Sequence, residues 1–301
     1  MPSVRHLALD FIAVTILTSL FAATLSAEDK DKPAAARKPW TTSRLHGSPL
    51  PPEPYKLVSS FPALKFNRPT SIEEVPSQNR LLITEMSGKV FTFPKDSKSA
   101  KPDLLIDLAA NLPKELASKS VSLFDAELHP NFKENHQLFL CYVHPGNRGH
   151  TRVSRFTLTA DVPSKANSEE VLITWPSGGH NGGCLEFGQD GMLYISTGDG
   201  SGPNPPDGLT SGQDVSDLLG SILRIDVDHK SNDKLYTVPA DNPFVENMLG
   251  LPEIWAYGLR NPWKFGTDPV TGNIFAADNG RETWEMVHKI VRGGNCGWPV
   301  M

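Results

Sequence analysis

Short runs of apolar residues, broken by Gly, Pro, Asn and Asp, fill most of the chain from about Tyr55 onward. Apolar and polar positions often alternate within these runs, and few segments show the 3.6-residue period of an amphipathic helix. Such a pattern is typical of many short antiparallel strands joined by turns. The sequence therefore predicts an all-β fold.

A degenerate repeat of a polar turn followed by a β-rich strand recurs four times, at residues 79–84, 135–140, 190–195 and 271–276. Taking Leu82, Phe139, Tyr194 and Phe275 as equivalent gives steps of 57, 55 and 81 residues. Known propeller blades repeat every ~40–50 residues, to which loop insertions add. The third and fourth copies also share a Phe-Gly-x-Asp lead-in. We interpret the four copies as four blades, although any turn followed by a strand would look similar.

The N-terminal region differs in composition from the rest of the chain. Residues 1–27 resemble a secretory signal peptide, with Arg5 and His6 before an apolar stretch and with Ser26 and Ala27 at a small-residue cleavage zone. An uncleaved anchor is the alternative. Residues 28–54 are rich in Lys, Ala, Pro and Ser, which predicts a flexible linker before a propeller at 55–301. The protein is therefore expected to be secreted or periplasmic, with no membrane span after signal removal.

Charge and cysteine content narrow the possible partners. The 301-residue chain has a net charge of −5 with acids and bases intermixed, so no nucleic-acid partner is expected. Its three cysteines, Cys141, Cys184 and Cys296, leave at least one unpaired. We expect buried free thiols, with a Cys184–Cys296 bridge as the less favoured option.

The segment most informative about chemistry is Gly-Gly-His-Asn-Gly-Gly at residues 178–183. Flanking glycines let the backbone approach a ligand closely and leave the imidazole of His180 sterically open. Because imidazole titrates near neutral pH, such a histidine can act as a general base. A structural histidine is the competing interpretation.

Two further segments offer groups that bind anions and cations. Arg260 and Asn261 place a fork of donors beside an amide, which suits carboxylate or quinone oxygens, although a structural arginine would look the same. Residues 278–285 and 293–299 form oxygen-rich loops bent by glycines, which can offer oxygens to calcium or serve as plain turns. The loop at 199–204 is interpreted as a long connection between strands.

Taken together and in order, these segments resemble the soluble quinoprotein glucose/sorbosone dehydrogenase family. The resemblance covers about residues 66–299 and includes Arg68-Pro69-Thr70, His129-Pro130-x-Phe132 and the Leu-Leu-Gly-x-Ile-Leu-Arg-Ile-Asp run at 218–226. It implies a six-bladed β-propeller that binds pyrroloquinoline quinone (PQQ) over its axis.

The resemblance also implies roles for particular residues. His180 matches the catalytic base that takes the sugar's hydroxyl proton as hydride passes to the quinone. Arg260 and Asn261 match the pair that contacts the reacting quinone oxygen. The backbone carbonyls of Gly280 and Arg281 align with those that hold the cofactor's calcium. The expected partners are thus an aldose or related sugar and an external electron acceptor.

Several positions depart from the family pattern. Gly179 stands where catalytic members carry an acid, so the partner that orients His180 is expected to be missing. Ser120 stands at the place of a quinone-contacting glutamine, and Cys296 at that of a tyrosine before Gly-Trp-Pro. Residues 285–288 read Glu-Met-Val-His where the family has Asp-Glu-Ile-Asn. This departure and Cys296 together weaken the case for a second calcium. The chain stops at Met301, where relatives continue, so we expect about four of six blades.

Three functions follow from these observations. The favoured one is a PQQ-dependent oxidoreductase of sugars. The alternative is a non-catalytic propeller that binds a glycan or a protein after loss of the quinone site, which Gly179 and Ser120 favour. A calcium-dependent lactonase is a third possibility, but it leaves the motif around His180 unexplained.

Overall fold

The computed structural model describes residues 56–96, 101–146, 149–159, 166–246, 248–282 and 284–300. The predicted signal peptide and linker lie outside these residues. All of the described strands belong to one compact unit, Val58–Met301. Helix is confined in the described chain to α1 (Phe132–Asn135) and a 3-10 turn (Lys114–Leu116). Neither is long or apolar enough to cross a membrane.

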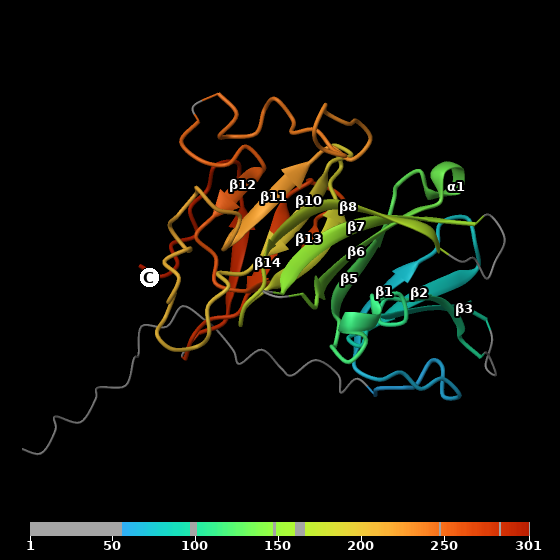
Figure 1. Cartoon of the computed structure of the whole chain (residues 1–301). Helices are drawn as coiled ribbons and strands as arrows, with labels where there is room; N and C mark the ends of the chain where they lie inside the picture. The colour runs from blue at the N-terminus through green and yellow to red at the C-terminus, as the bar shows by residue number, and fades with distance from the viewer. Residues whose placement is uncertain are drawn as a thin grey trace, which may run out of the picture. The chain divides into compact units, whose positions relative to one another are not determined.

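Four antiparallel sheets follow one another along the chain, and within each sheet the strands pair in sequence order (Figure 1). The first two sheets comprise β1 (Pro69–Glu74), β2 (Arg80–Glu85), β3 (Lys89–Pro94), β4 (Asp103–Asp107) and β5 (Ser122–Leu128), β6 (Gln137–His144), β7 (His150–Leu158), β8 (Ala166–Pro176). The last two comprise β9 (Gly182–Phe187), β10 (Leu193–Thr197), β11 (Ser221–Ile225), β12 (Ile254–Tyr257) and β13 (Pro262–Thr267), β14 (Ile274–Asp278), β15 (Met286–Ile290).

Each copy of the sequence repeat forms the second strand of one sheet, namely β2, β6, β10 and β14. The prediction of an all-β chain with four blades is therefore confirmed. A turn followed by a strand recurs because every blade is a meander that re-enters its sheet in the same way.

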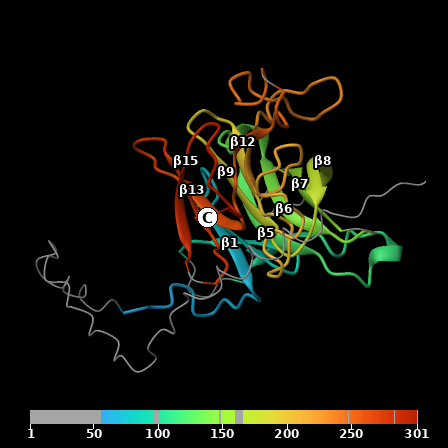
Figure 2. The same ribbon diagram turned by 90° about the vertical axis from the view of Figure 1, so that its left-hand side faces the viewer.

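The first strands of the sheets lie side by side, β5 against β1 and β9, and β9 against β13 (Figures 1 and 2). Residues of these four strands line a cavity of about 450 Å³. This is a propeller arrangement, in which the innermost strand of each blade faces a common axis.

The hydrophobic core lies between successive blades. Leu82 and Val90 of the first blade pack in one cluster with Leu123 and Leu140 of the second. Equivalent clusters join the second blade to the third and the third to the fourth. Strands β10 and β11 are buried along their whole length because neighbouring blades cover both faces of their sheet.

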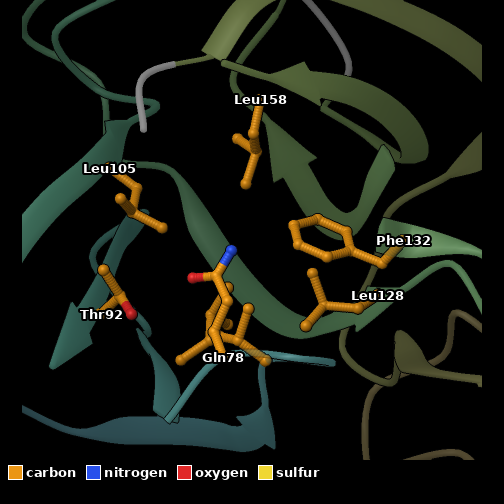
Figure 3. Close-up of a pocket in the computed structure, with 8 residues that line it drawn as sticks. Gln78, Thr92, Leu105, Leu128, Phe132 and Leu158 are labelled. Atoms are coloured by element: carbon orange, nitrogen blue, oxygen red, sulfur yellow. The ribbon is translucent and has the colours of Figure 1, made fainter. Parts of the chain in front are cut away.

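The core between the first two blades encloses a cavity of about 10 Å³ (Figure 3). Leu105, Leu128, Phe132 and Leu158 surround it, and the Gln78 amide points into it. A space of this size has room for about one water molecule. The functional site therefore lies elsewhere in the molecule.

The three cysteines are unpaired, as the sequence predicts. Cys141 and Cys184 are buried, whereas Cys296 is half-buried. Burial raises the pKa of the Cys296 thiol to about 11. The less favoured Cys184–Cys296 bridge is absent from the structure.

Candidate active site

The loop that carries His180 connects β8 to β9, and glycines let it lie directly on a second loop. A Cβ atom on Gly178 would stand 1.8 Å from the carbonyl oxygen of Gly200. The N–H of Gly179 donates to that same oxygen at 3.1 Å. Asn181 closes the loop, because its amide accepts from the N–H of Gly178 and donates to the Gly178 carbonyl, both at 2.9 Å. The loop is thus rigid where it presents the imidazole.

His180 is paired with a buried acid from that second loop. Its Nδ1 lies 2.7 Å from Oδ1 of Asp199, whose side chain is fully buried, while the His180 side chain is 12% exposed. The backbone N–H of Ser201 donates to the same Oδ1 at 2.9 Å. A carboxylate only accepts hydrogen bonds, so this pairing places the imidazole proton on Nδ1. Nε2 makes no hydrogen bond to another described residue and is left as the basic nitrogen.

The expectation that His180 lacks an orienting acid is wrong. The resemblance implies an acid at the position of Gly179, but it is Asp199, 19 residues further along the chain than His180, that makes the orienting contact. From the sequence alone, the loop that begins at Asp199 is interpreted as a long connection between strands. The sequence feature that could have indicated this acid is an aspartate between two glycines after a predicted strand.

Arg260 and Asn261 lie between β12 and β13 and are tied to both loops. The carbonyl of Arg260 accepts from the N–H of Asp199 at 2.8 Å. Oδ1 of Asn261 accepts from the N–H of Gly182 at 3.1 Å. The structure therefore gathers three residues of the predicted site, His180, Arg260 and Asn261, although they are far apart in sequence.

Asp278, at the end of β14, holds the backbone of Arg260 and Asn261 in place. Its two oxygens accept the backbone N–H groups of Arg260 at 3.0 Å and Asn261 at 2.6 Å. Burial raises the pKa of Asp278, and these two N–H groups and His288 act against that effect. The carboxyl group thus holds the backbone at the start of β13 in place.

The loop after β14 supplies carbonyl oxygens to the arginine side chain. Nη1 of Arg260 donates to the carbonyls of Asn279 and Gly280, both at 3.0 Å. A Cβ on Gly280 would stand 1.5 Å from the carbonyl oxygen of Trp284, so only glycine fits there. The side chain of Arg281 turns to Oδ1 of Asn204 at 2.7 Å. Gly280 thus joins the cluster, whereas the Arg281 side chain does not.

The axial cavity forms a second polar region. Glu73 of β1, Asp125 and Glu127 of β5, Glu186 of β9 and Lys264 of β13 line it. Nζ of Lys264 lies 2.9 Å from Oδ1 of Asp125. Burial, followed by the charge of Glu73, raises the pKa of Glu127 to about 9. Burial, followed by the charge of Asp125, raises that of Glu73 to about 7.

The family model for glucose/sorbosone dehydrogenases matches residues 66–301. The aldose sugar dehydrogenase YliI of Escherichia coli is 25% identical, over 78% of this chain and 60% of its own length. The human hedgehog-interacting protein is 32% identical, over 50% of this chain and 23% of its own length.

The fold of the chain is also similar to that of solved glucose dehydrogenases. A crystal structure of glucose dehydrogenase has a TM-score of 0.63 and 27% identity, covering 77% of this chain and 63% of that chain. The chain spans less than two thirds of the length of the curated relatives it matches.

Proposed function

The chain belongs to the glucose/sorbosone dehydrogenase family, and we propose that it oxidises the hydroxyl-bearing carbon of an aldose or related sugar with PQQ as cofactor. The observation that carries this proposal is the buried pair formed by His180 and Asp199, with Nε2 of the imidazole left without a described partner. An orienting acid behind an imidazole is the arrangement that general-base catalysis requires.

In the proposed reaction, Nε2 of His180 takes the proton of the sugar hydroxyl. Asp199 accepts the hydrogen bond from Nδ1 and stabilises the positive charge that develops on the imidazole. The reacting carbon loses its hydrogen as hydride, and the C–O bond becomes a carbonyl. When bound, the quinone supplies the acceptor for this hydride.

Arg260 and Asn261 fit the position of groups that contact a quinone oxygen. Two carbonyls hold the Arg260 guanidinium, and the residue is only 7% exposed, so the guanidinium is a preorganised cation. Preorganised donors stabilise negative charge without having to reorient during the reaction. We assign to this pair the binding and polarisation of the reacting quinone oxygen.

Calcium would rely on backbone oxygens from this chain. No group of three His, Cys, Asp or Glu among the described residues could hold a metal ion. The candidate ligands are those that the family resemblance implies, the carbonyls of Gly280 and Arg281, and the Gly280 carbonyl also accepts from Arg260. Carbonyl oxygens suit calcium, whose remaining ligands would have to come from the acid groups of the cofactor.

The proposed setting follows from the same family and from the N-terminal sequence. The proposed substrates are a small sugar and an external electron acceptor. A secreted or periplasmic location is proposed from the signal-like residues 1–27.

The test is a titration of the chain with PQQ, with and without calcium, followed by dye reduction with glucose and other aldoses. We expect saturable, calcium-dependent binding. His180→Ala is expected to keep that binding and to lower the rate of dye reduction about 1,000-fold, because general-base catalysis contributes on the order of 10²–10⁴. A folded chain that binds no PQQ would contradict the proposal.

A non-catalytic propeller that binds a glycan or a protein is the second candidate. Ser120 favours it, because by the family resemblance it stands at the place of a quinone-contacting glutamine. The likeness to hedgehog-interacting protein supports a binding role, since that protein is named for a protein partner. This candidate predicts no PQQ binding in the same titration.

A further inference from the structure

Trp298, in the Gly-Trp-Pro segment near the end of the described chain, is held in place by three other segments. Its backbone N–H donates to the carbonyl of Gly258 at 2.9 Å. Its own carbonyl accepts from the Gln213 amide at 2.6 Å. A Cβ on Gly212 would stand 2.8 Å from the indole ring, so this glycine makes room for it. The side chain is 7% exposed and is fixed by its surroundings.

The indole N–H of Trp298 binds the acid behind the candidate base. Nε1 donates to Oδ2 of Asp199 at 2.8 Å, and both groups are buried. The other oxygen, Oδ1, serves His180 and Ser201. Each oxygen of the carboxylate therefore has its own donor, and the indole fixes the one that His180 does not use. This contact opposes rotation of the carboxylate about its Cβ–Cγ bond.

The ring of Trp298 also lies beside the candidate quinone-binding arginine. The guanidinium carbon of Arg260 stands 5.5 Å from the ring centroid, within the range of a cation–π contact. Arg260 donates to the carbonyls of Asn279 and Gly280 as well. Ring and carbonyls together restrict the direction in which the guanidinium can point.

We propose that Trp298 is a positioning residue that couples the His180–Asp199 pair to Arg260. One rigid side chain thereby sets the orientation of both halves of the site, the base and the cation on the cofactor side. The catalytic meaning of this coupling rests on the proposed function, whereas the geometry itself involves only residues of this chain.

Removing the indole N–H should abolish the contact with Asp199 and keep the contact of the ring with Arg260. Trp298→Phe keeps an aromatic face for Arg260 but leaves Oδ2 of Asp199 without its buried donor. A buried acceptor without a donor is costly, so the carboxylate is expected to reorient or to recruit water. Trp298→Leu removes the aromatic face as well, so Arg260 is expected to lose its restraint too.

The experiment compares these variants by ¹⁵N NMR of the imidazoles in the full chain without PQQ. The wild type is expected to show His180 as a single Nδ1–H tautomer when neutral, and Trp298→Phe to show a mixture. With PQQ, Trp298→Phe should lower kcat about tenfold with little change in KM, as loss of an orienting contact commonly does. Trp298→Leu should in addition raise the PQQ concentration that gives half-saturation.

The matched control is Trp255→Phe, since Trp255 also stacks on an arginine, Arg224 at 4.8 Å, but lies away from the site. It should leave the His180 signals unchanged. A folded Trp298→Phe chain with the wild-type imidazole spectrum would overturn the proposal. A wild type that fails to bind PQQ rejects the proposed function instead, and leaves the spectral test intact.

If Trp298→Phe does not fold, a second variant tests the contact between Trp298 and Asp199 from the other side. In Asp199→Asn the indole N–H loses a carboxylate acceptor, so the ¹⁵N–¹H signal of Trp298 should move while that of Trp255 stays. An unmoved Trp298 signal overturns the proposed contact.

Discussion

Two regions of this propeller bury carboxyl groups, and they treat them differently. At the candidate active site, Asp199 receives three hydrogen-bond donors, from His180, Ser201 and Trp298. In the axial cavity, Glu127 receives one, a backbone N–H at 3.3 Å. Burial that a single donor does not offset favours the protonated acid, and together with the charge of Glu73 it raises the pKa of Glu127 to about 9.

The difference shows that burial alone does not identify a working acid. The axial carboxyl groups face one another across a cavity with a single lysine, so their charges oppose ionisation. At the candidate active site, by contrast, each buried carboxyl group accepts hydrogen bonds from segments that carry candidate functional residues. We therefore expect substitutions in the first region to alter stability and those in the second to alter chemistry.

The largest effect on this comparison is expected from Asp199→Asn. The amide cannot accept from both His180 and Trp298 as the carboxylate does, so the imidazole loses its fixed tautomer. We expect dye reduction with PQQ to fall about 100-fold, in the range found for orienting partners. Urea unfolding of the variant measures the free energy of unfolding separately from activity and checks that the fold is kept. A loss confined to stability would break the comparison.

Glu127→Gln should give the second largest effect, on stability and not on activity. The folded chain holds a proton on Glu127 up to about pH 9, whereas an unfolded glutamate releases it near 4.5. The contribution to stability is therefore full below about 4.5 and is lost as the pH rises toward 9. The wild type should lose on the order of a few kcal/mol over this window, and the glutamine variant should show a flatter profile.

Glu74→Gln is the matched control for that experiment, because Glu74 lies on the neighbouring strand β1 with a side chain 68% exposed. It should leave the pH profile of unfolding as in the wild type. If both variants flatten the profile equally, the axial cavity is not the source of the pH dependence.

Glu73→Gln should have the smallest of these effects. Its folded pKa of about 7 is raised from 4.5, so its contribution to stability is full below about 4.5 and is lost by about 7. Chemical unfolding of the variant should therefore differ from the wild type mainly below neutral pH, with a smaller difference above it because the charge of Glu73 helps to raise the pKa of Glu127. A difference above neutral pH as large as the one below it would mean that Glu73 and Glu127 titrate as one coupled pair.

Sequence patterns captured what is local in this molecule. Because each second strand follows its turn directly, the repeat located β2, β6, β10 and β14. The glycine-rich motif likewise located the His180 loop, since the close backbone approach it permits is encoded within a few residues.

What depends on the packing of blades was not predictable in the same way. The contact between His180 and Asp199 forms only when two loops from different strands meet. The axial acids come from β1, β5 and β9, and no local pattern indicates that these strands are innermost. In the sequence, Trp298 belongs to a glycine-bent loop at 293–299 that can offer oxygens to calcium or serve as a plain turn, whereas its contacts reach Asp199 and Arg260 across the tertiary structure.

The placement of the apolar clusters between blades has a consequence for how the protein unfolds. Each cluster is shared by two adjacent sheets, so a sheet derives its stability from its neighbours, as in an array with nearest-neighbour coupling. A lesion in one blade then weakens the adjacent ones in turn. The candidate site spans the third and fourth blades, so its geometry depends on the coupling between these two blades.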